Sequence, residues 1–461
     1  MSVNIVCFIK KVTLMFTKIG KKWYICGILS VKTHFPMLTL KQIRDDKEFA
    51  IARLAVKGVD AAATIDQICA LDDARKEQQQ TLDKNLAEQN AAAKQIGALF
   101  AQGKREEAEA IKTRTAQLKE ESKALDAQLK ETTEKLNALI VSLPNFPAAI
   151  VPEGRTAEDN VVVKQGGEIP VLGEGALPHW ELASKYDIID FELGVKLTGA
   201  GFPVYKGKGA ALQRALITYF LDQNIEAGYM EVLPPIMVNE ASGFGTGQLP
   251  DKEGQMYHAT ADNFYMVPTA EVPVTNIYRD CIVDEKELPI RLTAYTPCFR
   301  REAGSYGKDV RGLNRLHQFD KVEIVRINHP DTSYEALDQM VAHVEKLVAG
   351  LGLPYRIVRL CGGDMSFTSA LTYDFEVYSA AQGRWLEVSS VSNFESFQAN
   401  RLKLRYRSEG KKTALAHTLN GSSLALPRIV AALLENNQTE DGIVVPEVLR
   451  PYTKFGIING K

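Results

Sequence analysis

The clearest periodicity in the chain lies between about Thr64 and Val141, a stretch without proline. In its second half, two interleaved series with seven-residue spacing comprise Ile111, Leu118, Leu125 and Thr132, and Thr115, Ser122, Leu129 and Leu136. Its first half carries a weaker series that steps by four and three: Leu82, Leu86, Gln89, Ala93, Ile96 and Phe100. Because only Gln102-Gly103-Lys104 connects the halves, the pattern predicts an antiparallel helical hairpin. Periodicity alone fits a dimerisation or spacer coil equally well.

The segment Leu143-Pro144-Asn145-Phe146-Pro147 ends this hairpin, because proline cannot continue a helix. Beyond it, strand-like runs (Val161–Val163, Ile324–Ile327 and Tyr355–Leu360) alternate with helical runs (Ala210–Ala227, Tyr334–Leu351 and Leu424–Asn436). The pattern predicts a helical arm over residues 37–147 and a mixed α+β domain over residues 148–461.

Residues 1–36 have a different composition, with six lysines and no acidic residue, and we interpret them as a non-native or leader extension. A transit peptide would be rich in arginine and serine, and lysines interrupt the apolar stretch that a secretory signal needs. We therefore expect Met37 to be the true initiator.

Composition narrows the class of protein. The hydrophobic share is 45%, and no apolar run approaches the roughly 18 residues of a spanning helix, so we expect no membrane segment. The six cysteines form no CxxC pair, which argues against a zinc site and favours a reducing, cytoplasmic location. The formal net charge is −2, so any RNA binding must come from local basic patches.

The most informative stretch is Arg291–Val325, which predicts two antiparallel strands joined by a polar loop. This arrangement places Arg300, Glu302 and Phe319 beside one another. A guanidinium binds phosphate oxygens, a carboxylate accepts from an exocyclic amine, and a ring stacks on a base, so the set can hold a nucleotide. A surface hairpin with solvated charges is the alternative.

A second stretch, Asn420–Arg428, runs into an amphipathic helix and places Arg428 in its first turn. An arginine there opposes the helix dipole unless an anion such as a triphosphate binds. A tolerated surface arginine is the alternative.

Two shorter stretches carry acidic residues. Val267–Pro273 is an acidic turn between prolines, and Leu386–Asn393 holds Glu387 and Ser390, whose oxygens suit magnesium. Alternation along a half-buried strand explains either one equally well. The chain has neither GxxxxGK[ST] nor a GxGxxG after a strand, which disfavours the common nucleotide folds.

Taken together, these stretches resemble the bacterial-type seryl-tRNA synthetases across Met37–Lys461. The resemblance rests on FRREAG, RGLNRLHQFDKVE, TAE, EVSS, NGSSLALPR and VVPEVLRPY. Gly201–Val238, which includes Leu233-Pro234-Pro235, looks like the first class II motif, which builds a homodimer interface. The family's fold would be an antiparallel sheet of six or seven strands with flanking helices, preceded by a long helical arm.

The resemblance also implies roles for single residues. The implied ATP-binding residues are Arg300, Arg301, Glu302, Arg315, Phe319, Glu387, Val388, Ser389, Ser390 and Arg428, with Arg300 and Arg428 catalytic. The implied serine-binding residues are Thr269, Ala270, Glu271, Arg300, Glu323 and Ser422, and Glu387 and Ser390 would hold Mg²⁺ with ATP. Arg301 stands where the family often has serine, and Ser423 where it often has glycine.

The implied activity is a serine–tRNA ligase that forms seryl-adenylate and transfers serine to tRNA(Ser), with selenocysteine tRNA left open. A ligase that loads an amino acid onto a carrier protein is one alternative, but such relatives are expected to lack the arm. An inactive coiled-coil RNA-binding protein is another, and joint retention of Arg300, Glu302, Phe319, Glu323 and Arg428 argues against it.

Overall fold

The computed structural model describes residues 16–19, 22–25, 40–251, 253–302, 311–410 and 412–460. The chain divides into two units, Met1–Phe35 and Pro36–Lys461. Within the first unit, β1 (Phe16–Ile19) pairs antiparallel with β2 (Lys22–Ile25). Most of residues 1–36, and Met37 itself, lie outside the described residues, so the extension and the start at Met37 stay predictions.

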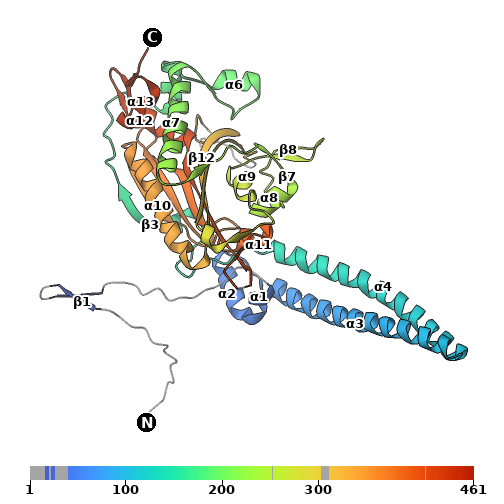
Figure 1. Cartoon of the computed structure of the whole chain (residues 1–461). Helices are drawn as coiled ribbons and strands as arrows, with labels where there is room; N and C mark the ends of the chain where they lie inside the picture. Colours follow the sequence, from blue (N-terminus) through green and yellow to red (C-terminus); the bar gives the residue numbers. More distant parts are fainter. Residues whose placement is uncertain are drawn as a thin grey trace. The chain divides into compact units, whose positions relative to one another are not determined.

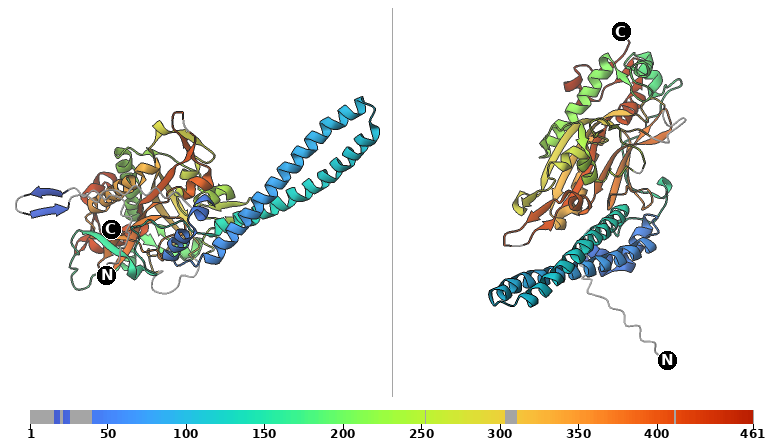
Figure 2. Two further views of the ribbon diagram at one scale, coloured as in Figure 1. Left: turned by 90° about the horizontal axis from the view of Figure 1, so that it is seen from below. Right: turned by 90° about the vertical axis from the view of Figure 1, so that its right-hand side faces the viewer.

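The predicted hairpin is confirmed. Helices α1 (Leu40–Asp45) and α2 (Lys47–Val56) precede two long helices, α3 (Ala62–Ala101) and α4 (Arg105–Ser142). Figures 1 and 2 show α3 and α4 running side by side in opposite directions. Gly103 takes a positive φ of 76° between them, a conformation that glycine adopts at little cost.

The helix seam follows the sequence pattern in α4 but not in α3. Every predicted seam residue of α4 is buried or half-buried. In α3, Leu86, Ala93 and Phe100 are exposed, Leu86 by 44% and Phe100 by 48%, so their predicted seam positions are wrong. The less exposed series is Leu82, Asn85, Gln89, Ala92, Ile96 and Leu99. Both series alternate steps of three and four, and Leu86 is more apolar than Asn85, which lies on the seam in its place.

The base of the hairpin packs on the α+β domain. Helix α4 ends at Ser142, just before Pro144, as predicted. Leu143 and Phe146 join a buried cluster with residues of α2 and α3 and with Phe397 of α11 (Phe397–Leu402). The buried Asn145 side chain donates to the carbonyl oxygens of Thr368 and Phe394, each at 2.9 Å. The arm is therefore joined to the larger domain by both apolar and polar contacts.

The larger domain is built on an eight-stranded sheet of order β3-β13-β14-β15-β18-β12-β11-β6. Its strands are β3 (Val161–Gly166), β6 (Met230–Glu231), β11 (Ile290–Phe299), β12 (Gln318–Asn328), β13 (Tyr355–Arg359), β14 (Leu371–Ser379), β15 (Arg384–Asn393) and β18 (His417–Ala425). All neighbours pair antiparallel except β11 and β6. The expected six or seven strands are exceeded because the two-residue β6 adds a parallel edge.

Helices α7 (Gly207–Glu226), α10 (Ser333–Gly350) and α12 (Leu426–Asn436) lie along this sheet (Figure 1). Their apolar side chains and those of the sheet form the main core. The other helices are α5 (His179–Lys185), α6 (Phe191–Leu197), α8 (Glu240–Thr246), α9 (Glu271–Asn276) and α13 (Arg450–Thr453). Within the described ranges, no helix has the length and apolar character that crossing a membrane requires.

Short strands complete the domain in small sheets. They are β4 (Ile189–Asp190), β5 (Val204–Tyr205), β7 (Met237–Asn239), β8 (His258–Ala259), β9 (Phe264–Met266), β10 (Ile282–Asp284), β16 (Arg405–Arg407), β17 (Ala414–Leu415), β19 (Gln438–Thr439), β20 (Gly442–Val444) and β21 (Ile457–Ile458).

Candidate active site

A cavity of about 950 Å³ lies against the central strands of the large sheet, and all four chemistry-bearing stretches line it. The predicted site residues at its wall are Thr269, Glu271, Arg300, Glu302, Arg315, Phe319, Glu323, Glu387, Val388, Ser389, Ser390, Ser422 and Arg428. Antiparallel pairing brings them together, because β12 lies between β11 and β18, and β18 lies beside β15.

Two predicted site residues are not part of the cavity wall. The Ala270 side chain is fully buried in a small apolar cluster with Val274 and Leu292. Arg301 is exposed, and its backbone N–H donates to the carbonyl oxygen of Gln255 at 2.8 Å. Ser423, the other unusual position, also points elsewhere, since its buried hydroxyl donates to Asn224 at 2.8 Å.

One end of the cavity is an acidic pocket lined with hydroxyl groups. Glu323 lies opposite Ser422 in the β12–β18 register. The hydroxyl of Thr269 donates to Glu323 at 3.1 Å and accepts from the backbone N–H of Glu271 at 3.2 Å. All four side chains are buried, and Gln398 donates to Glu271 at 2.6 Å. The pocket suits a small ligand with a positive charge and a hydroxyl.

The buried carboxyl of Glu271 is affected by the charge of Glu323. Burial, and next the negative charge of Glu323, raise the pKa of Glu271 to about 7. Lys321 lies two residues before Glu323 on β12 and forms an ion pair with it at 2.5 Å. The lysine partly compensates the negative charge of the pocket.

The other end of the cavity is basic and aromatic. The guanidinium of Arg300, which follows β11, lies 5.3 Å from the ring centre of Phe319. Cys298 and Phe319 are register partners, which brings the end of β11 next to the start of β12. Glu302 and Arg315 form an ion pair across the same loop. The structure therefore brings together the three residues predicted to hold a nucleotide.

Arg428 occupies the first turn of α12, as predicted. Its Nε donates to the carbonyl oxygen of Asn314 at 3.0 Å, and its Nη1 donates to that of Glu387 at 2.9 Å. These bonds orient the guanidinium at the cavity wall. On the adjacent strand, the hydroxyl of Ser389 donates to the carbonyl oxygen of Ser422 at 2.6 Å, so this side chain joins β15 to β18.

A cluster of oxygen atoms lies beside Arg428. Ser390 donates to Asp374 at 2.5 Å and lies 3.5 Å from a carboxylate oxygen of Glu387. Burial, and then the charge of Glu387, raise the pKa of Asp374 well above its usual range. Glu387 also forms an ion pair with Nη1 of Arg428 at 3.8 Å. Two acidic side chains with a hydroxyl fit a hard divalent cation. Among the described residues, no group of three or more histidine, cysteine and acidic side chains is arranged to hold a metal, and the absence of zinc stays a prediction.

Sequence reasoning missed several residues of the wall. Lys321 had a detectable signal, because residues two apart on a strand share a face and Glu323 was already a candidate. Asp374 had none, since only the β14–β15 pairing brings it opposite Ser390. The segment Gly363–Thr368 also lines the cavity and carries no motif.

Two arginines line one cavity on this antiparallel sheet: one comes from the strand–loop–strand unit and the other from helix α12. This arrangement defines the catalytic domain of a class II aminoacyl-tRNA synthetase. The family model of the tRNA synthetase class II core domain (G, H, P, S and T) matches residues 256–437. The model of the seryl-tRNA synthetase N-terminal domain matches residues 37–147, which contain α3 and α4.

Similar proteins agree with both matches. The chain is 51% identical over 427 residues to a serine–tRNA ligase of Salinibacter ruber, covering 92% of this chain and 100% of the relative. It is 45% identical to the enzyme of the same name from Magnetococcus marinus, covering 90% and 98%. A crystal structure of seryl-tRNA synthetase from Pyrococcus horikoshii complexed with ATP superimposes with a TM-score of 0.87 at 31% identity, covering 92% of this chain and 100% of that one. The chain belongs to the seryl-tRNA synthetase family.

Proposed function

We propose that the 950 Å³ cavity is where this serine–tRNA ligase forms seryl-adenylate from serine and ATP, before serine passes to the 3′ end of tRNA(Ser). The main support for this proposal is that one cavity joins a buried acidic pocket to a basic and aromatic end. An amino acid has an ammonium group at one side and a carboxylate at the other, so it can bridge the two ends.

We assign serine to the acidic pocket. Glu271 and Glu323 would face the ammonium group, and Thr269 and Ser422 would face the hydroxyl group and the main chain of serine. Alanine or glycine would leave buried polar groups without partners, which can discriminate by about 10⁴-fold or more. Lys321 would release Glu323 as the ammonium group arrives.

We assign ATP to the basic end. Arg300 would hold the α-phosphate and the serine carboxylate, Phe319 would stack on adenine, and Glu302 would accept from its exocyclic amine. Arg315 and Arg428 would meet the outer phosphates. The attacking carboxylate is ionised at neutral pH, so the step needs no protein base, and positioning with charge neutralisation lowers the barrier.

Magnesium is the implied metal of this reaction. Glu387 and Ser390 would hold it, and Asp374 extends the same oxygen cluster. When bound, Mg²⁺ would neutralise phosphate charge.

We assign tRNA binding to the α3–α4 hairpin, through its basic residues and the sugar–phosphate backbone of the RNA. We make no assignment for selenocysteine tRNA. The presence of the arm argues against a carrier-protein ligase, because such relatives are expected to lack it. We also propose a cytoplasmic homodimer, supported by exposed apolar side chains near the first class II motif, of which Leu233 is 87% and Met230 58% exposed.

The direct test is ATP–pyrophosphate exchange with each of the twenty amino acids in turn. Serine should support exchange at least 10⁴-fold better than alanine by the hydroxyl argument above. Equal exchange with alanine and serine would refute the pocket assignment, and exchange without subsequent charging of tRNA would favour a carrier-protein ligase.

A further inference from the structure

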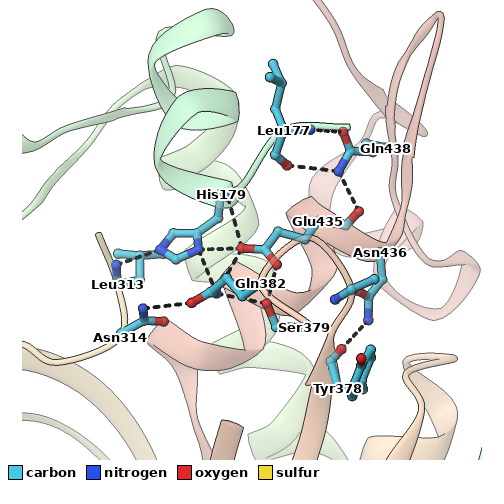
Figure 3. Close-up of polar contacts among 11 residues, drawn as sticks. Leu177, His179, Leu313, Asn314, Tyr378, Ser379, Gln382, Glu435, Asn436 and Gln438 are labelled. Atoms are coloured by element: carbon cyan, nitrogen blue, oxygen red, sulfur yellow. Dashed lines mark hydrogen bonds and ion pairs between the residues drawn. The ribbon is translucent and has the colours of Figure 1, made fainter. Parts of the chain in front are cut away.

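A buried hydrogen-bond network lies behind the ATP end of the cavity and is used by none of the assignments above (Figure 3). Its centre is His179, at the start of α5, with Glu435 near the end of α12. Both side chains are 0% exposed, and neither lines the cavity. Their Nδ1–Oε1 distance is 2.7 Å.

The partners of His179 define its protonation state. The backbone N–H of Leu313 donates to Nε2 at 2.8 Å, so Nε2 must be an unprotonated acceptor. The proton therefore sits on Nδ1 and is donated to Glu435. Glu435 also accepts from the backbone N–H of His179 and from Gln382, each at 3.0 Å, and from the hydroxyl of Ser379.

These donors keep Glu435 ionised. Burial by itself would raise the pKa of Glu435, but the hydrogen bonds from His179 and Ser379 outweigh burial and lower the pKa. A buried anion is costly, and an apolar core would pack α5 against α12 without that cost. The buried network is therefore suited to holding a neighbouring backbone segment through directional hydrogen bonds.

The His179–Glu435 network holds the second half of the β11–β12 loop, the part that leads into β12. Gly312 has a positive φ of 65°, and a Cβ at this position would lie 2.2 Å from Nε2 of His179, so the loop backbone rests directly on the ring. The side-chain amide of Asn314 donates to Gln382 at 2.9 Å. The carbonyl oxygen of Asn314 accepts from Arg428, and Arg315 is the next residue.

We propose that His179 is a positioning residue for adenylate formation, fixing Gly312–Arg315 so that Arg315 and Arg428 meet the phosphates of ATP. The proposal rests on the assignment of ATP to this end of the cavity. His179 acts through the loop and touches neither substrate. Its Nδ1–H tautomer, set by Glu435, supplies the one acceptor that the N–H of Leu313 requires.

Two substitutions test the two hydrogen bonds of the His179 ring, to Glu435 and to Leu313, one at a time. His179→Asn keeps a donor near Nδ1 for Glu435 but loses the acceptor for Leu313, whereas His179→Gln keeps an acceptor near Nε2 but loses the donor. In serine-dependent pyrophosphate exchange, we expect His179→Asn to raise KM for ATP about fivefold to tenfold, the scale of one lost hydrogen bond. His179→Gln should raise it about twofold, and KM for serine should stay the same in both.

The matched control is His417→Asn, which removes another buried histidine whose ring bonds Ser333 at 2.8 Å and lies off the cavity wall. It should leave both KM values unchanged. Gln382→Leu cuts the link to Asn314 and removes the Gln382 donor to Glu435 and Ser379, while it leaves both ring atoms of His179 in place. It should raise KM for ATP about threefold, so it tests the proposal if His179→Asn fails to fold.

An unchanged KM for ATP in folded His179→Asn, or in Gln382→Leu where His179→Asn does not fold, would overturn the positioning role. Equal rises in the KM values for ATP and serine would overturn it too, because they indicate a general packing defect. Absence of serine-dependent exchange in the unaltered chain would instead refute the proposed function.

Discussion

The arm and the catalytic domain contain similar kinds of charged residues but place them in opposite surroundings. On α4, Lys112 pairs with Glu109 and Lys135 pairs with Glu131, with every side chain at least 60% exposed. In the catalytic domain, Glu271, Glu323 and Glu435 are buried and held by named donors. Exposed pairs are worth about 0–1 kcal/mol and exchange partners readily, whereas buried groups have already lost their hydration.

This difference bears on the ligand recognition that is proposed for each region. If the arm binds tRNA as proposed, its exposed basic residues would exchange a glutamate for an RNA phosphate at little cost, which would give salt-sensitive recognition of the shape of the RNA. If serine binds in the acidic pocket as proposed, the buried carboxylates would be fixed before it arrives, which would give discrimination between small molecules. The two functions should therefore be separable by substitution.

The largest effect is expected from Arg300→Ala. It removes the guanidinium that is proposed to hold the α-phosphate, where charge develops, so exchange should fall about a hundredfold to a thousandfold. Charging of tRNA should fall in parallel, since it needs the adenylate. The exposed neighbour provides the comparison: Arg301→Ala should lower exchange less than about threefold, because it removes no contact with the cavity. Equal losses would contradict the placement of the two side chains.

The next effect concerns the acidic pocket. Glu323→Gln removes one negative charge that would face the ammonium group, a contact worth about 1.5–3 kcal/mol. KM for serine in the exchange assay should rise about tenfold to a hundredfold. ATP binding, measured by calorimetry without serine, should change little. Similar damage to both substrates would argue against serine at this end.

A smaller effect should follow from pH. Burial and the charge of Glu323 raise the pKa of Glu271 to about 7, so this carboxyl gains a proton as the pH falls through 7. KM for serine should therefore be a few times higher at pH 6 than at pH 8, and Glu271→Gln should flatten the difference. Stability changes in the opposite direction: a raised carboxyl pKa stabilises the folded chain at low pH, and this contribution is lost as the pH rises through about 7.

The smallest effect is expected at the start of the chain. A chain beginning at Met37 should have the melting temperature and charging rate of the full chain, because every residue that lines the cavity lies later in the chain. Thermal denaturation and aminoacylation on both chains provide the measurement. A clear loss in either would show that residues 1–36 contribute.

Local patterns predicted much of this structure. The helix boundaries near Gly103 and Pro144 and the first-turn position of Arg428 follow from local sequence chemistry. The α3 seam was predicted wrongly because hydrophobicity favoured Leu86 over Asn85, and the partner helix decides between such neighbours. The His179–Glu435 contact joins residues 256 positions apart, and no single-sequence pattern encodes such a pairing.

We assign tRNA binding to the arm and adenylate formation to the catalytic domain. This assignment is tested most directly by removing the arm. Replacing Glu77–Thr133 with a short flexible loop keeps Asp72 with Arg44, Arg75 and Lys76, and leaves Leu136 in the cluster at the base of the hairpin. Serine-dependent pyrophosphate exchange should stay within about twofold of the full chain, because every residue assigned to adenylate formation lies after Pro147. KM for tRNA should rise about a hundredfold or more, as expected when a set of phosphate contacts is lost. Charging at ordinary tRNA concentrations with a near-normal rate would contradict the account and make the arm a spacer.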